Sequence, residues 1–290
     1  LWVYEGQTQY WAVVLAARSG LWTPGQTQEV MAQTVANYET RKGRQWRSLH
    51  DTVHQGIVDF NDLPQAWGDW QRGFDFYAEG SLLWLAVDAE IRQRSKGKRS
   101  LDDVAKAFYA GGDGSTRVSQ FTEDDVFAVL QAVQPGDWRT FIESRLDAVD
   151  APLDGLEKAG WRVIYSDEPN LAIEDAEAAG GYDDYSYSLG LSLDDEGLIS
   201  SVVWQSPAFV AGLAKDTQIV AVHGRTYSAI RLERAIRQAQ QDRKPIDLLL
   251  RQDDHYRTVQ ISYHDGLRYP HLQRIDGSRD WLTSIVKARR

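Results

Sequence analysis

The sequence contains no cysteine, so the chain forms no disulfide and carries out no thiol chemistry. It also lacks any run of about 18 apolar residues, and we therefore expect no membrane-spanning segment. Basic residues are fewer than acidic ones, 32 against 42, which gives a net charge of −10. Nucleic acids and anionic membranes both bind a basic face, so this charge argues against either as a partner.

Apolar residues make up 42% of the sequence and charged residues 26%, which is normal for a folded globular protein. A length of 290 residues suggests two domains of ordinary size. Residues 1–150 show helical patterns nearly throughout. The segment 78–94 is apolar almost all round, which predicts a helix buried among others. The irregular segment 42–75 predicts a long excursion with short helical pieces.

The pattern changes after residue 150. Residues 151–184 are interpreted as a linker region, residues 185–265 as a small β-barrel-like domain with two short helices, and residues 266–290 as a C-terminal tail. Short strands are predicted at 187–193, 198–203, 218–222, 246–251 and 256–262. The sequence thus predicts an α+β multidomain protein in which a helical part comes first.

The first ten residues, LWVYEGQTQY, are mostly apolar or aromatic but include one carboxylate, Glu5, followed directly by Gly6. A carboxylate among aromatic side chains is desolvated, and a desolvated carboxylate needs a partner or a metal ion. The alternative is that Glu5 only caps the first turn of a helix.

Residues 2–10 fit W-x-x-E-G-x-T-x-Y, which resembles the second zinc-binding segment of the glycyl aminopeptidases, a family of gluzincin metallopeptidases. The resemblance implies that Glu5 is the third protein ligand of a catalytic zinc. Its two histidine ligands would lie upstream on an H-E-x-x-H helix. It also implies that residues 1–150 are the all-helical C-terminal half of a gluzincin catalytic domain.

A second segment, FYAEG at residues 76–80, lies at the start of the predicted buried helix. In the glycyl aminopeptidases and the related aminopeptidase N group, a Y-x-x-G at this place supplies a tyrosine. Its phenol hydrogen-bonds the oxyanion of the tetrahedral intermediate. Tyr77 and Gly80 match this pattern. The alternative is that Tyr77 packs the helix entry together with Phe74 and Phe76.

His50 and His54 have the i, i+4 spacing of a zincin helix. A basic, glycine-containing stretch precedes them, and no apolar helical pattern surrounds them. No ligand carboxylate follows at a zincin-like distance. We therefore predict that this pair does not bind zinc.

Residues 185–265 resemble a PDZ domain of the bacterial protease type. The resemblance rests on three ordered segments, SLGL at 188–191, SPAFVAGL at 206–213 and IVAVHG at 219–224. The first of these segments looks like the carboxylate-binding loop of that fold, made by Ser188, Leu189, Gly190 and Leu191.

A peptide groove would follow from this resemblance. Gly190 would let successive N–H groups point at one carboxylate, and the next strand would offer an exposed edge to an extended peptide. Leu232 and Ile236, on a predicted helix, would face into the groove. The alternative is a closed groove in a domain that serves only for packing or docking.

Together the resemblances imply the C-terminal portion of a zinc-dependent aminopeptidase that hydrolyses peptides with a small N-terminal residue such as Gly. Zinc is expected in the intact enzyme, together with the upstream segment that carries H-E-x-x-H. Without that segment we expect this chain to be inactive alone and to bind no zinc tightly. The alternative is a non-catalytic peptide-binding or scaffold module that holds C-terminal peptides at the PDZ groove. The family resemblance is compatible with a periplasmic or secreted protein.

Overall fold

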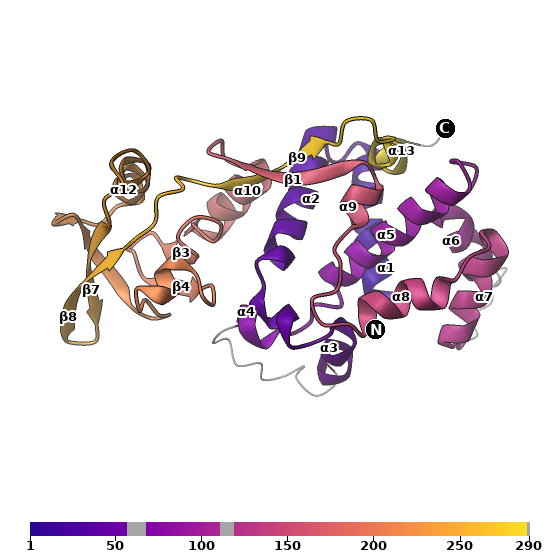
Figure 1. Ribbon diagram of the computed structural model, residues 1–290, viewed down its shortest axis with the longest axis horizontal. Helices are drawn as coiled ribbons and strands as arrows, with labels where there is room; N and C mark the ends of the chain where they lie inside the picture. The colour runs from indigo at the N-terminus through magenta and orange to yellow at the C-terminus, as the bar shows by residue number, and fades with distance from the viewer. Residues whose placement is uncertain (57–67, 111–118, 289–290) are drawn as a thin grey trace.

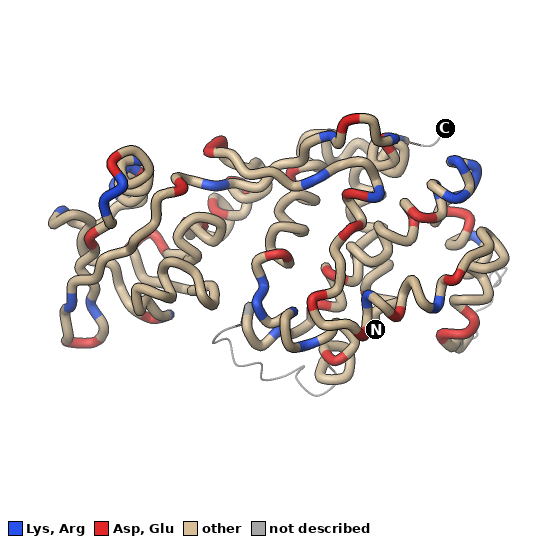
Figure 2. The backbone as a smooth tube through the Cα atoms, viewed as in Figure 1, with Lys and Arg blue, Asp and Glu red and all other residues tan. Residues whose placement is uncertain are grey.

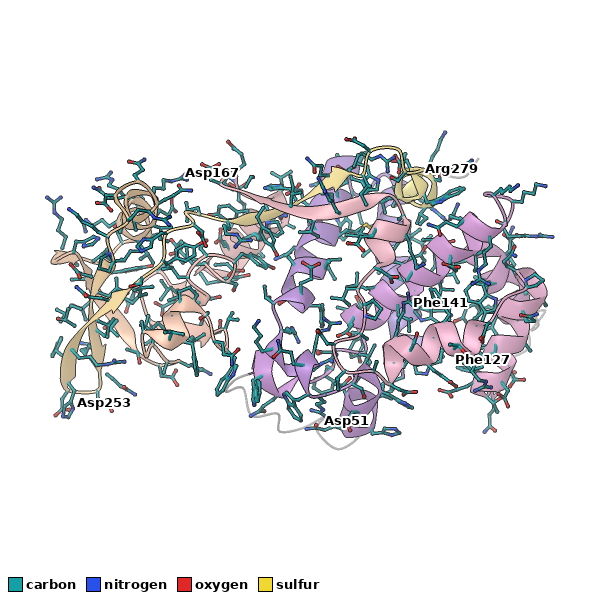
Figure 3. All side chains as sticks on the ribbon, in the orientation of Figure 1. Asp51, Phe127, Phe141, Asp167, Asp253 and Arg279 are labelled. Carbon is teal, nitrogen blue, oxygen red and sulfur yellow. The ribbon has the colours of Figure 1, made fainter. Side chains whose placement is uncertain are left out.

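The structure is a computed structural model that describes residues 1–56, 68–110 and 119–288. It confirms the predicted α+β fold, with helices gathered at one end and most strands at the other (Figure 1). In Figure 3, Phe127 marks the helical end and Asp253 the strand-rich end. We call these two parts the helical half and the strand-rich half. Within the described residues, no helix is long and apolar enough to cross a bilayer.

The helical half begins with two 16-residue helices. Its elements are α1 Tyr4–Ser19, α2 Pro24–Glu39, the 3-10 helix η1 Lys42–Gln45, α3 Leu49–Gly56, α4 Gly68–Gln71, α5 Ala78–Arg94, α6 Leu101–Tyr109, α7 Glu123–Val133, α8 Trp138–Leu146 and α9 Gly155–Lys158. Capping side chains fix several helix starts. The Thr23 hydroxyl accepts from the Gln26 amide, and the Ser100 amide donates to Asp103.

Helix α5 is the centre of the helical half, as its apolar sequence predicts. Trp84 in this helix is fully buried and stacks on Trp2, with ring centroids 5.7 Å apart. The Trp84 indole N–H donates to the Trp2 carbonyl over 3.1 Å. Tyr10, also fully enclosed, donates to the Asp88 carboxylate over 2.6 Å. These contacts fix α1 along α5.

Two strands far apart in the sequence connect the halves. Strand β1 Trp161–Ser166 pairs antiparallel with β9 Tyr269–Arg274, and α13 Trp281–Val286 follows. Trp281, Leu282 and Ile285 of α13 belong to the hydrophobic core of the helical half. The last residues therefore return to the helices after the strand-rich half is complete (Figure 1). The domain boundaries at 150, 184 and 265 remain predictions.

The strand-rich half holds two open sheets, so the described residues form no closed barrel. One sheet has the order β2-β3-β4 and the other β6-β5-β7-β8. The elements are α10 Leu171–Gly180, β2 Tyr182–Asp184, β3 Leu191–Asp194, β4 Ile199–Val202, α11 Pro207–Val210, β5 Gln218–Val222, β6 Arg225–Thr226, α12 Ala229–Asp242, β7 Ile246–Gln252 and β8 His255–Ile261. The strand predicted at 187–193 starts later than expected, because residues 185–190 turn back on themselves.

Candidate functional site

The contact between α1 and α5 is close enough to favour glycine on both helices. A Cβ atom placed on Gly6 would lie 3.0 Å from the backbone carbon of Gly80, and one on Gly80 would lie 3.0 Å from the Gly6 Cα. Both distances are tighter than an ordinary van der Waals contact, so a larger residue would force the backbones of the two helices apart by a few tenths of an ångström. The two glycines of the sequence motifs therefore have one shared physical function, which is to let the helices touch.

This contact brings Glu5 and Tyr77 together. Glu5 lies in the first turn of α1, and Tyr77 is the residue directly before α5. Both side chains are partly exposed, and the Tyr77 hydroxyl lies close enough to the Glu5 carboxylate for its negative charge to act on the phenol. Burial raises the pKa of Tyr77, and the negative charge of Glu5 raises it further. The phenol thus stays protonated at neutral pH and keeps a proton to donate.

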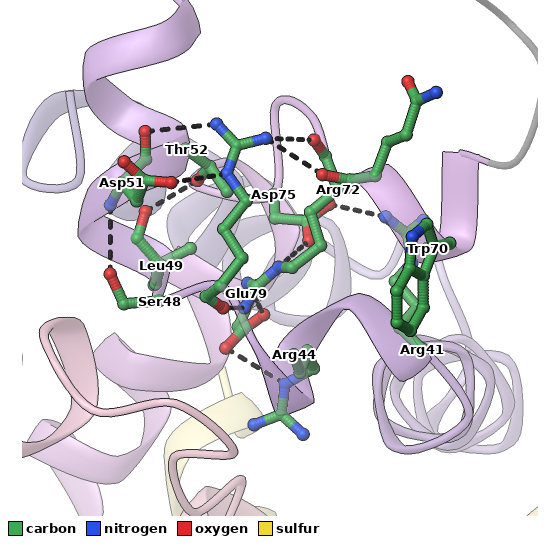
Figure 4. A network of polar contacts seen from close by, with 12 residues as sticks. Arg41, Arg44, Ser48, Leu49, Asp51, Thr52, Trp70, Arg72, Asp75 and Glu79 are labelled. Carbon is green, nitrogen blue, oxygen red and sulfur yellow. Dashed lines mark hydrogen bonds and ion pairs between the residues drawn. The ribbon is translucent and has the colours of Figure 1, made fainter.

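The turn before Tyr77 is held by a buried cluster of charges that the sequence did not reveal (Figure 4). Arg72 is its centre. The Arg72 guanidinium pairs with Asp75, Nε to Oδ2 2.7 Å, and with Glu79 through Nη2. All three side chains are almost fully buried. Glu79 lies between Tyr77 and Gly80 in the motif, so this cluster reaches directly into the candidate site.

Arginines from the irregular segment after α2 complete the cluster. Arg44 Nε is 3.3 Å from Glu79 Oε1, and Arg41 pairs with Asp75. Burial raises the pKa of Glu79, while the charges of Arg72 and Arg44 oppose that shift. Two guanidinium groups thus compensate a carboxylate that lies out of water.

Hydrogen bonds from arginine side chains to backbone carbonyls join the same turn to the segment between η1 and α3. Arg47 Nη1 donates to the carbonyls of Gln71, at 2.9 Å, and Arg72, at 3.0 Å. Arg72 Nη1 donates in return to the Arg47 carbonyl over 2.6 Å. Arg72 and Phe74 both have a backbone φ of 55°, a value that residues other than glycine rarely adopt. The reciprocal arginine contacts hold the chain in this conformation and so fix the approach to Tyr77.

His50 and His54 do lie on one face of a helix, because α3 spans Leu49–Gly56. Helix α3 is one of the short helical pieces predicted for the segment 42–75. Their rings stack 4.7 Å apart, and His50 Nδ1 contacts Asp147 Oδ1 at 2.7 Å. Across the described residues, no group of three or more His, Cys, Asp or Glu side chains is placed to hold a metal ion.

The loop at 188–191 has the predicted glycine turn. Gly190 has a φ of 79°, and a Cβ there would meet the Ser206 side chain. The amides of Ser188 and Gly190 both donate to the Tyr185 carbonyl, at 3.0 and 2.9 Å. The side chains of Leu189 and Leu191 are fully buried in the core of the strand-rich half. Two of the loop's N–H groups are therefore already used within the chain.

The strand that follows this loop offers no exposed edge, contrary to the prediction. Strand β3 pairs antiparallel with β2 on one side and with β4 on the other. Leu232 and Ile236 of α12 are fully buried in the same core, so they do not face an open groove. The chain's own segment Tyr182–Asp184 occupies the edge that a peptide strand would need.

Geometry and fold thus define a helical unit with a carboxylate–phenol pair, joined to a strand-rich unit. Residues 1–83, which contain Glu5 and Tyr77, match the family model described as M61 glycyl aminopeptidase. This match confirms the resemblance seen in the two motifs and supports a peptidase-related function. A search of curated proteins found no match to the chain.

A crystal structure of an aminopeptidase N family protein from Idiomarina loihiensis is similar to the chain, with a TM-score of 0.71 and 18% identity. The similarity covers 99% of this chain and 48% of that one, so the chain spans about half the length of that protein. At this identity the likeness shows the fold alone. The HtrA3 PDZ domain bound to a phage-derived ligand is 15% identical, covering 41% of this chain and 95% of that one. Its TM-score of 0.20 supports no conclusion.

Proposed function

We propose that this chain forms part of a zinc-dependent aminopeptidase and that Glu5 and Tyr77 belong to its active site. The observation that carries the proposal is the proximity of these two side chains, across a helix contact that two motif glycines make close. Both residues lie in the segment that matches the glycyl aminopeptidase family model. The substrates would be peptides with a free, small N-terminal residue such as Gly.

The donor set fits one part of a zinc site. Glu5 is a partly exposed carboxylate, which is a ligand type that catalytic zinc accepts beside histidine nitrogens. The histidine ligands and the general base would come from an H-E-x-x-H segment outside these 290 residues. Zinc held there would supply Lewis-acid polarisation of the scissile carbonyl.

Tyr77 would supply the complementary interaction. Its hydroxyl keeps its proton at neutral pH and can donate it as a hydrogen bond to the carbonyl oxygen as negative charge develops. The buried Arg72 cluster fixes the turn that carries this hydroxyl, so the donor would already be in position before the reaction. Such preorganised donors contribute mainly to the rate of the chemical step rather than to substrate binding.

The proposal is tested with Tyr77→Phe in a protein extended upstream to include the H-E-x-x-H segment. Loss of an oxyanion donor should lower kcat on a glycyl peptide by about 100- to 1,000-fold, with little change in KM. Tyr4→Phe is the matched control, because Tyr4 is an exposed tyrosine at the start of α1, next to Glu5. A kcat for Tyr77→Phe equal to that of the control would exclude the proposed role.

The same assay separates the chain from the intact enzyme. We expect the 290-residue chain alone to show no aminopeptidase activity and to retain no zinc after dialysis. Activity of this form would mean that the zinc ligands lie within it. The alternative, a peptide-binding module acting through residues 188–191, is less favoured because both edges of β3 are paired within the chain.

A further inference from the structure

A cleft of about 490 Å³ lies beside α12 in the strand-rich half. Its walls come from α12, from the turn between β5 and β6, and from the segment that leads into β7. Its floor includes Val222, Ala235 and Ala239, whose side chains are nearly fully buried. Helix α12 lies at the opposite end of the molecule from α1 (Figure 1), so this cleft is distinct from the candidate site at Tyr77.

Three cationic side chains from three different elements line the cleft. They are Arg225 in β6, Arg234 in α12 and Lys244 in the connection to β7. All three are exposed, and in the described part of the chain their side chains form no hydrogen bond or ion pair. A fourth, Arg231, donates to the Thr226 carbonyl over 2.6 Å. Figure 2 shows basic positions along α12 at this end of the molecule.

The two carboxylates that line the cleft already have partners in the chain. Asp247 Oδ1 accepts from Gln260 Nε2 over 2.8 Å, and its Oδ2 is 3.5 Å from His223 Nδ1. Asp242 accepts from the Lys244 amide over 3.0 Å and from the Gln238 side chain. Four cations against two carboxylates leave the cleft positive in a chain of net charge −10. The attraction for an anion is therefore local and does not come from the overall charge.

We propose that this cleft binds an acidic peptide segment. Cations on three elements suit a ligand with several carboxylates, each able to form a charge-assisted hydrogen bond. The apolar floor suits the methylene groups of glutamate side chains, which an inorganic anion lacks. A cavity of about 490 Å³ falls in the size range of small-ligand sites. The cations that line it are exposed, so a flexible peptide can reach them. The site is independent of the proposed peptidase function.

The test is calorimetric titration of the 290-residue chain with an end-blocked tetraglutamate peptide at low salt. We expect saturable binding that Arg225→Glu/Arg234→Glu weakens by at least about tenfold, because charge-assisted hydrogen bonds are lost. The control variant is Lys215→Glu/Arg251→Glu, which makes the same charge change at exposed positions of this half outside the cleft. Both variants replace exposed side chains, and unchanged melting temperatures verify their folding.

Two further arms identify the ligand chemistry. Tetraglutamine should not bind, since it has the length but not the charge. Inorganic phosphate at the same concentration should fail to displace tetraglutamate. Equal weakening by both double variants would show that only overall charge matters, and it would overturn the proposal. Displacement by phosphate, or binding of tetraglutamine, would overturn the assignment to an acidic peptide.

Discussion

The two halves of this molecule hold their sequence motifs in place differently, the helical half with buried charges and the strand-rich half with an apolar core. In the helical half, buried charges around Arg72 hold the turn before Tyr77, and the Tyr77–Glu5 pair stays partly exposed. In the strand-rich half, an apolar core encloses Leu189 and Leu191, and the chain's own β2 covers the edge of β3. The comparison shows that a recognisable motif marks an accessible site only where the surrounding chain leaves it uncovered.

The two designs also differ in how they respond to mutation. An apolar core tolerates exchanges that keep volume and hydrophobic character. A buried ion cluster does not, because removal of one member leaves the others charged and unpaired out of water. We therefore expect the candidate site of the helical half to depend on a few residues that never touch a substrate.

The largest effect should come from Arg72→Met. This change leaves Asp75 and Glu79 without their central partner, and we expect a loss of about 3 to 5 kcal/mol in the free energy of unfolding. Urea denaturation followed by tryptophan fluorescence measures it. Arg139→Met is the control, because Arg139 pairs with Asp124 and Glu143 at the surface, and it should change stability little. Similar losses for both variants would show that the buried cluster is not special.

A smaller effect is expected from Gly80→Ala. The added methyl group meets the Gly6 backbone at 3.0 Å, which should push α1 away from α5 and cost about 1 to 3 kcal/mol despite the better helix propensity of alanine. Gly25→Ala in α2 is the matched control, because the nearest atom to its Cβ is 3.9 Å away. Thermal unfolding compares the two. A Gly80→Ala protein as stable as the control would mean that the helix contact is looser than described.

The helical site was largely predictable from the sequence, because its signals are local. Glu5 with Gly6 and Tyr77 with Gly80 each lie within five residues of one another, and the caps at Thr23 and Ser100 follow from short motifs. What the sequence could not show is that the two glycines touch. A glycine in the sequence indicates that another segment can approach the backbone closely at that position. It does not indicate which segment does so.

The arginine cluster was missed for a different reason. Arg44 and Glu79 are 35 positions apart, and an ion pair across an irregular segment leaves no periodicity to detect. The one available signal was the spacing of Asp75 and Glu79 directly around Tyr77, since two acidic residues beside an aromatic turn need partners if buried.

The covered edge of β3 was missed because the covering segment looks unlike a strand. Residues 182–184 read Tyr-Asp-Asp, and aspartate is depleted in strands. The segment was therefore interpreted as part of a linker. Its pairing depends on tertiary contacts, including the Asp184 amide, which donates to Glu177 Oε1 over 2.6 Å. Such support from α10 cannot be deduced from the short strand itself.

The smallest expected effect is a pH dependence of stability that arises from Glu177, which supports the covering strand β2. Burial raises the pKa of Glu177 to about 7, and the nearby charges of Asp184, Asp183 and Glu174 add to the shift, while the Asp184 amide opposes it. The pKa is thus higher in the folded than in the unfolded chain, so the folded state binds more protons between about pH 4.5 and 7. Stability from this group must fall as the pH rises through that window.

Glu177→Gln should remove this dependence. Glutamine can still accept the hydrogen bond from the Asp184 amide but carries no charge at any pH. Because the side chain is half-buried and water screens its neighbours, we expect a gain below about 1 kcal/mol at pH 8 and a clearly smaller one at pH 5. Melting temperatures at both pH values measure the difference, with Asp175→Asn as a control that neutralises a carboxylate at an exposed position of α10. An equal gain at pH 5 and pH 8 would contradict the titration of Glu177, because the gain must grow as the folded-state carboxyl ionises between these two pH values.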